Sequence, residues 1–152
     1  MLIRAAEKKD LSRIAEIFVF NNRANYFPIF RDEYYSFSEL QVVTVIENFE
    51  NYIGRLSETY VYDDGIIRGF ITVSAGEIQK LYTDTFFQGC GIGTLLLEFA
   101  VEKLNAYFLF ALEKNVKAIA FYKRNGFLQS NERKYEEGTT EWLIKLIKAQ
   151  SI

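Results

Sequence analysis

The sequence contains no histidine and only one cysteine, Cys90, among 152 residues. Zinc centres are built mainly from cysteine and histidine, so this composition argues against one, and we expect no metal site. A single cysteine cannot form an internal disulfide. Proton transfer at an active site would have to use other side chains, and glutamate and tyrosine are the remaining candidates.

Long apolar runs and an excess of positive charge are also missing. No hydrophobic stretch approaches the ~20 residues that a membrane-spanning helix needs, and the start of the chain lacks a signal-peptide pattern. The formal net charge is −2, which gives no basic surface for nucleic acid. We therefore expect a cytoplasmic protein that binds neither nucleic acid nor membrane, with residues 1–152 forming a single domain.

The composition is that of a globular α/β protein, 49% hydrophobic and 16% aromatic. Hydrophobic periodicity and turn signals divide the chain into strands and helices. Asp10 is a plausible N-cap for the first helix, which should fray near Asn21 and Asn22. The other expected elements are a strand at 2–6, a helix over 38–56, a hairpin of strands 59–62 and 66–73, strands 78–83 and 107–112, helices from 95 and over 118–123, and a closing hairpin of strands 127–135 and 140–147.

A glycine-rich turn between a strand and a helix is the most informative stretch. The apolar strand Ile78–Thr83 leads to Gln88-Gly89-Cys90-Gly91-Ile92-Gly93-Thr94, and an apolar helix begins at Leu95. Glycines let a ligand approach the main chain, and the N–H groups and dipole of a helix N-terminus favour negative charge. The pattern therefore predicts an anion-binding site.

Spacing separates the ligands that such turns bind. A Walker A loop ends in Gly-Lys-Ser/Thr, whereas Gly93 is followed by Thr94 without a lysine. A dinucleotide fingerprint reads G-x-G-x-x-G with an acidic residue about 20 positions further on. Glu113 fits that spacing, but this loop reads G-x-G-x-G. From the loop alone, a nucleotide site and an ordinary tight turn both stay open.

Two motifs together resemble the GNAT superfamily of N-acetyltransferases. Gln88, Gly91 and Gly93 match the family's Gln/Arg-x-x-Gly-x-Gly/Ala phosphate loop. Residues 115–127 match its N-x-x-A-x-x-F-Y-x-x-x-G-F segment. Two motifs in the right order are far more specific than either alone. The resemblance covers roughly residues 2–147 and is strongest over 66–127.

The resemblance implies an α/β fold of order βααβββαβαββ, in which a mixed, mostly antiparallel sheet flanked by helices splays at its middle to admit acetyl-CoA. Acetyl-CoA would be the cosubstrate, with its pyrophosphate on the glycine loop and its pantetheine arm added along strand 78–83. Cys90 would act through its amide, although a reactive thiol is the alternative interpretation. The implied cofactor-binding residues are Leu81, Tyr82, Thr83, Gln88, Gly89, Cys90, Gly91, Ile92, Gly93, Thr94, Asn115 and Phe121.

Tyr122 and Glu77 are the candidate catalytic residues. The resemblance implies that Tyr122 donates a proton to the departing CoA thiolate; the simpler interpretation is a packed core aromatic. Glu77 would take a proton from the acceptor amine through water, because an amine of pKa near 10.4 is almost wholly protonated at neutral pH. A solvated charge at the start of the strand is the alternative. Backbone donors near Tyr82 would stabilise the oxyanion.

The predicted reaction is direct acetyl transfer from acetyl-CoA to a primary amine, without an acyl-enzyme. The segment Tyr26–Phe37 is rich in aromatic residues and, with its surroundings, contains few acidic ones, among them Asp32, Glu33 and Glu39. We therefore expect a small, weakly charged acceptor rather than a polycation. Protein or peptide N-acetylation and a non-catalytic acyl-CoA-binding domain are the alternatives. The sequence does not identify the acceptor or the oligomeric state, and a homodimer is compatible with it.

Overall fold

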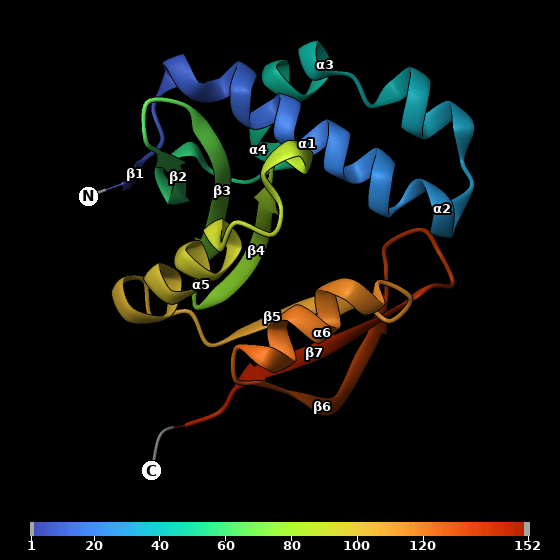
Figure 1. Ribbon diagram of the computed structural model, residues 1–152. Coiled ribbons are helices and arrows are strands. Elements are labelled where there is room, and N and C mark those ends of the chain that lie inside the picture. Colours follow the sequence, from blue (N-terminus) through green and yellow to red (C-terminus); the bar gives the residue numbers. More distant parts are fainter. Residues whose placement is uncertain (1, 151–152) are drawn as a thin grey trace.

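The computed structural model describes residues 2–150, which are built around a seven-stranded sheet of order β1-β2-β3-β4-β5-β7-β6 (Figure 1). Every adjacent pair is antiparallel except β4 and β5. The predicted mixed, mostly antiparallel sheet is therefore confirmed. The strands are β1 (Ile3–Ala5), β2 (Thr59–Asp63), β3 (Ile67–Ser74), β4 (Glu77–Thr83), β5 (Phe108–Leu112), β6 (Phe127–Tyr135) and β7 (Trp142–Lys148).

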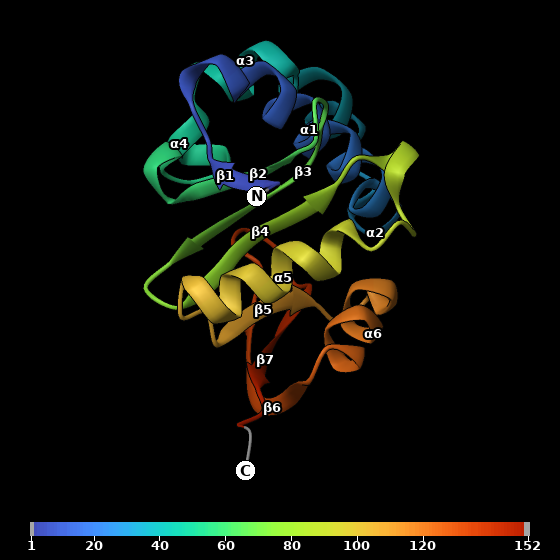
Figure 2. The same ribbon diagram turned by 60° about the vertical axis from the view of Figure 1, so that its left-hand side comes forward.

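Helices cover both faces of this sheet (Figures 1 and 2). Two separate hydrophobic clusters result, one beneath α5 and α6 and one beneath α1, α3 and α4. Within residues 2–150, no helix is both long and apolar enough to cross a membrane. The helices are α1 (Leu11–Asn25), α2 (Phe27–Phe30), α3 (Val42–Glu47), α4 (Phe49–Tyr52), α5 (Ile92–Lys103) and α6 (Val116–Arg124).

The alternation of side chains along β2 and β3 explains how one sheet supports two cores. Successive strand residues point to opposite faces. Val61 and Phe70 accordingly pack under α1, while Tyr62 and Ile71 pack under α5. Fully burying one such side chain stabilises a fold by roughly 1.5–3 kcal/mol. The helices on both faces of the sheet therefore pack against the same two strands, β2 and β3.

β4 and β5 are parallel but diverge almost at once. A single pair, Glu77 and Phe108, joins them. β4 also contains a bulge, because the consecutive β3 residues Thr72 and Val73 pair with Lys80 and Ile78 and leave Gln79 of β4 unpaired. Bulges increase the local twist of a strand. The sheet is thus open in its middle, as the sequence resemblance implied, and β4 keeps one free edge beyond the junction.

The predicted end of the first helix is wrong, because α1 continues through Asn21 and Asn22 to Asn25. Both asparagines are buried. The Asn21 side chain donates to the carbonyl of Ile17 one turn earlier, at 2.9 Å. Asparagine usually disfavours helices because its side chain competes for backbone groups. Here its side-chain bonds leave the helix intact and join it to β4.

The single helix predicted over 38–56 is also wrong. The chain instead forms a five-residue π-type turn, Tyr35–Glu39, followed by α3 and α4. Leu40 and Asn48 have non-helical dihedral angles and interrupt the run. The Arg23 guanidinium donates to the carbonyls of Ser36 and Leu40 at 3.0 and 3.1 Å, which satisfies groups that a continuous helix would have used.

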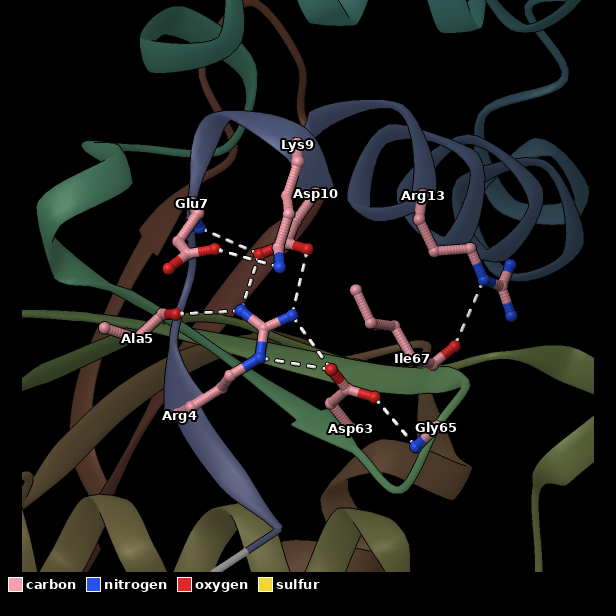
Figure 3. A network of polar contacts seen from close by, with 9 residues as sticks. All are labelled: Arg4, Ala5, Glu7, Lys9, Asp10, Arg13, Asp63, Gly65 and Ile67. Carbon is pink, nitrogen blue, oxygen red and sulfur yellow. Dashed lines mark hydrogen bonds and ion pairs between the residues drawn. The ribbon is translucent and has the colours of Figure 1, made fainter.

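Asp10 stands at the N-cap position of α1 but makes no side-chain cap bond to that helix. Its carboxylate instead accepts hydrogen bonds from both terminal nitrogens of Arg4, at 2.8 and 3.0 Å, and from the backbone N–H of Glu7 (Figure 3). Arg4 also donates to Asp63. The bond to Arg4 is the main reason that the pKa of Asp10 lies below its usual range. Asp10 therefore joins β1, β2 and the start of α1.

We expect Arg4→Met to lower the free energy of unfolding by about 2–3 kcal/mol, because it leaves the 3% exposed Asp10 carboxylate without its cation. That value lies below the range for fully buried pairs, since the Arg4 side chain is 31% exposed. Chemical denaturation measures it. Lys9→Met is the matched control, because the Lys9–Glu7 pair is exposed at both ends and should contribute under about 1 kcal/mol. Equal losses in both variants would contradict the assignment.

Candidate active site

The opening between β4 and β5 is continuous with a large cleft of about 1170 Å³. The two diverging strands form its floor. On one side stand the glycine loop, the start of α5 and α6; on the other stand the end of α1, the segment after it, and the β6–β7 turn. The volume exceeds that of an ordinary small-ligand pocket. The cleft can therefore hold two ligands, and we call its sides the loop half and the front half.

The glycine loop borders the loop half with an array of unused donors. Gly89 and Gly91 have left-handed φ angles of 82° and 83°, which glycine adopts without strain. A Cβ atom at either position would meet nothing within 4 Å. In the part of the chain that the structure describes, no backbone or side-chain acceptor takes a hydrogen bond from the backbone N–H groups of residues 89–94. These donors fit an anion such as pyrophosphate.

The free edge of β4 presents main-chain groups from alternate residues. Asp84 donates its N–H to the carbonyl of Arg68 in β3, and Tyr82 lies opposite Phe70 in the same ladder. Hydrogen-bonded pairs alternate along an antiparallel ladder, so the Tyr82 main chain belongs to the sheet. Leu81 presents its N–H and carbonyl to the cleft, whereas Thr83 presents only its N–H, because its carbonyl accepts hydrogen bonds from the Asn21 and Gln88 side chains. Of the three residues expected to bind the pantetheine arm, only these two have main-chain groups available for it.

A buried carboxamide connects α1 to this edge. Asn21 donates to the Thr83 carbonyl at 2.9 Å, and its side-chain oxygen accepts from Gln88 at 3.2 Å. Gln88 also donates to the Thr83 carbonyl, at 3.4 Å. Gln88 is therefore held against β4 rather than pointing into solvent. Cys90 is exposed at the loop, and it is not among the residues that line the cleft.

Tyr122 lies in the cleft floor of the loop half, on α6, and is 7% exposed. Its ring packs edge-on against Phe121 and Phe127. Burial is the main reason that its pKa lies well above the usual value for tyrosine. Asn115 caps α6, accepting a hydrogen bond from the Ala118 N–H at 3.3 Å. Tyr122 is thus a packed aromatic residue and Asn115 a helix cap, and both also line the cleft.

Glu77 stands where the two strands part, opposite Phe108, and lines the cleft while half-buried. The structure brings together nearly all of the predicted site residues. Leu81, Tyr82, Thr83, Gln88, Gly89, Gly91, Ile92, Gly93, Thr94, Asn115, Phe121, Tyr122 and Glu77 all line the same cleft, and only Cys90 does not.

Several charged residues of the cleft were missed from the sequence. Lys117 and Arg124 line it from α6, where cations would suit phosphate groups; basic residues around the second motif were the available signal. Lys80 lines it from β4, and Glu136 and Glu137 line it from the β6–β7 turn. That turn had been interpreted only as a connection. The expectation that few carboxylates face the acceptor rested on the segment Tyr26–Phe37 and its surroundings alone, and Glu136 and Glu137 correct it.

Known proteins share these features. A model of the GNAT acetyltransferase domain matches residues 55–129. The peptidyl-lysine N-acetyltransferase YjaB of Escherichia coli (strain K12) is 34% identical over 59 residues, which span 39% of this chain and 40% of that protein. The solution structure of apo YjaB matches with a TM-score of 0.74 and 21% identity, covering 98% of this chain and 97% of that one.

Two crystal structures extend the likeness in fold. An N-acetyltransferase from Staphylococcus aureus Mu50 matches with a TM-score of 0.75 at 17% identity, covering 97% of this chain and 100% of the other. The PaiA N-acetyltransferase of Thermoplasma acidophilum, in complex with coenzyme A, has a TM-score of 0.63 at 20% identity, covering 95% and 97%. With both sequence motifs and the splayed sheet, the matched domain places this chain in the GNAT superfamily of acetyltransferases.

Proposed function

We propose that the protein is an acetyl-CoA-dependent N-acetyltransferase that acetylates a primary amine directly, without an acyl-enzyme. One observation carries the proposal: an unused N–H array, a free strand edge and a buried tyrosine border a single cleft. The first suits a pyrophosphate and the second an amide-containing arm. The Thermoplasma relative that binds coenzyme A supports the same assignment.

The residues that would hold acetyl-CoA follow from the geometry. The N–H groups of 89–94 would bind the pyrophosphate, with Lys117 and Arg124 nearby for the remaining phosphate charge. Leu81 would pair with the pantetheine arm through its N–H and carbonyl, and Thr83 through its N–H, because the Thr83 carbonyl already accepts from Asn21 and Gln88. The Leu81 N–H is then the best-placed donor for an oxyanion, in place of the Tyr82 N–H, which belongs to the ladder.

The reaction needs one group that accepts a proton from the amine and another that donates a proton to the departing thiolate. The amine nitrogen attacks the thioester carbon, the carbon–sulfur bond breaks, and an amide forms. Glu77 would accept the proton lost by the amine, through water, from the point where the strands part. Tyr122 would donate a proton to the departing thiolate from the loop half. No acyl-enzyme is required, since an amine is a sufficient nucleophile.

The acceptor belongs to the front half, where we propose a small-molecule amine. Tyr26, Tyr35 and Tyr52 line that half and suit a compact ligand with an apolar part. A protein or peptide acceptor is the second candidate, because the relative YjaB is a peptidyl-lysine N-acetyltransferase. A non-catalytic acyl-CoA-binding domain is a third, and release of the CoA thiol in the presence of amines separates it from both.

We expect acetyl-CoA to raise the melting temperature, since a ligand at a hundredfold excess over its Kd adds about 2.7 kcal/mol to the free energy of unfolding. NAD and ATP should do far less. Gly91→Ala should abolish most of the shift, because a methyl group would enter the space next to the N–H array. Differential scanning fluorimetry with each ligand measures this.

The matched control is Gly138→Ala, whose φ of 76° and open surroundings resemble those of Gly91. In both variants, an alanine held in the left-handed conformation should lower the free energy of unfolding by a similar amount, roughly 1–2 kcal/mol. Gly138→Ala should keep the full acetyl-CoA shift. Stabilisation by NAD equal to that by acetyl-CoA would overturn the assignment of the loop.

A further inference from the structure

Lys80 is a charged group of the cleft that no proposed step uses. It lies on β4 directly after the bulge and lines the cleft. Lysine side chains usually extend into water, so a half-buried ammonium normally has a compensating partner. Among residues 2–150, no carboxylate lies within 4.0 Å of the Lys80 ammonium, and no hydrogen bond of the described residues involves it.

Two carboxylates act on Lys80 from a distance. Glu136, from the β6–β7 turn, and Glu77, from its own strand, both favour the charged form. Burial acts in the opposite direction and is larger, so the pKa of Lys80 lies below its ordinary value. The surroundings therefore do not fully offset the desolvation of the ammonium. A negatively charged group placed beside it would do so.

The position of Lys80 on β4 shows which part of the cleft it faces, because it lies two residues before Tyr82, on the same face of the strand, and Tyr82 packs against the cluster beneath α1. The charge of Glu136 also raises the pKa values of Tyr26, Tyr35 and Tyr82, although burial is the main cause of each shift. Tyr26, Tyr35, Tyr82 and Glu136 also line the same cleft as Lys80. Lys80 therefore faces the front half, where the acceptor binds under the proposed function.

A second unused group lies in the same cleft, on α1. The side-chain oxygen of Asn22 is inaccessible to solvent and has no hydrogen-bond partner among the described residues. The residue is 6% exposed and lines the cleft. A buried acceptor without a donor costs roughly 1–3 kcal/mol. The front half thus holds one cation without an anion and one acceptor without a donor.

We propose that Lys80 binds a carboxylate carried by the acceptor, so that the substrate is an amine with its own acidic group, such as an amino acid or the carboxyl end of a short peptide. A polyamine is disfavoured, because Lys80 would repel a second ammonium at this position. This inference rests on the proposed function for the reaction, but its anion site can be tested separately.

The test compares acceptors that differ only at the acidic group: phenylalanine, phenylalaninamide and phenethylamine. Their rings suit the tyrosine-lined wall, and release of the CoA thiol reports each rate. We expect kcat/KM for phenylalanine to exceed that for the amide by about tenfold or more, the effect of one charge-assisted hydrogen bond. The rates are compared across a range of pH, since the amino groups of phenylalanine and phenylalaninamide differ in their own pKa.

Variants at position 80 separate charge from proton transfer. Lys80→Met should reduce the preference for phenylalanine over the amide by about tenfold. Lys80→Arg keeps the cation and should retain most of the preference, whereas a base or nucleophile at this position would not survive that change. Lys134→Met is the control. Lys134 also lines the cleft, but its ammonium lies 4.1 Å from the centre of the Phe110 ring, and its removal should leave the preference unchanged.

Binding without turnover decides the case if no acceptor is acetylated. N-acetylphenylalanine should raise the melting temperature more than N-acetylphenylalaninamide in the wild type, and equally in Lys80→Met. The proposal is overturned if the wild type prefers the amide or the amine, if Lys80→Met slows all acceptors alike, or if mass spectrometry finds Lys80 itself acetylated. Turnover without any preference rejects the anion site alone. Preferential binding without turnover rejects the transferase and keeps the site.

Discussion

Replacing Tyr122 by phenylalanine is expected to lower turnover by about 10²–10⁴-fold while acetyl-CoA binding changes little. The substitution keeps a ring of nearly the same shape against Phe121 and Phe127, whose centroids lie 5.2 and 5.8 Å away. Only the hydroxyl is lost. Since the departing thiolate would then leave without a proton donor, the effect should fall on kcat rather than on cosubstrate affinity.

The buried position of Tyr122 adds a pH signature to this result. Burial raises its pKa well above that of free tyrosine, which is near 10. The phenol therefore stays protonated throughout the neutral and mildly alkaline range. We expect no fall in rate from loss of this proton below about pH 10, and any alkaline fall there must come from another group.

Steady-state kinetics with one good acceptor measures the loss of turnover in Tyr122→Phe, and the melting shift with acetyl-CoA shows whether cosubstrate binding is kept. Tyr107→Phe is the control, because Tyr107 is 53% exposed and is not among the residues that line the cleft. An unchanged kcat in Tyr122→Phe would return this residue to a packing role. Loss of the acetyl-CoA shift would instead show that the hydroxyl serves binding.

Much of the fold followed from local signals. The Asp-Gly turn between two apolar runs predicted the β2–β3 hairpin, and the structure has it with Asp63 facing Ile67. The glycine loop follows β4 and the second motif follows β5, and both line the loop half of the cleft, as the resemblance implied. Such elements are determined by residues close in sequence, which is why they can be predicted.

The failures concern long-range contacts. Asn21 looked like a helix end, yet it is held by Thr83 and Gln88, more than 60 positions away. Arg23 donates hydrogen bonds to the carbonyls of Ser36 and Leu40, in the segment where the predicted second helix is interrupted. Periodicity carries no information on such partners. Whether Glu136 faces solvent or a cleft likewise depends on where the β6–β7 turn lies in three dimensions.

Stability at high pH should fall steeply, because four tyrosines of the cleft have raised pKa values: Tyr35 and a further three. Burial is the main cause for Tyr26, Tyr82 and Tyr122 alike. The hydroxyls of Tyr26 and Tyr82 also lie 3.0 Å apart and share a hydrogen bond, which requires that at least one stays protonated. All three therefore resist ionisation in the folded state.

The sign of the effect follows from proton linkage. Unfolded tyrosines lose their protons near pH 10, whereas these three keep theirs in the native protein. The stability that these protonated tyrosines contribute to the folded protein is thus fully present below about pH 10. It is lost as the pH rises from there through their folded-state pKa values. Each group lowers the free energy of unfolding by up to about 1.4 kcal/mol per pH unit in that window, so three together give up to about 4 kcal/mol per pH unit.

Denaturant unfolding at intervals from about pH 9 to about pH 11 measures this slope. Tyr82→Phe should reduce it by about 1.4 kcal/mol per pH unit, even though loss of the bond to Tyr26 also lowers stability at every pH. Tyr34→Phe is the control, because that side chain is 69% exposed and meets water in both states. A slope that is the same in all three proteins would mean that Tyr82 ionises as readily in the folded chain as in the unfolded one. In that case the front half of the cleft would be far wetter than its burial implies, and the environment assigned to Lys80 would have to be abandoned with it.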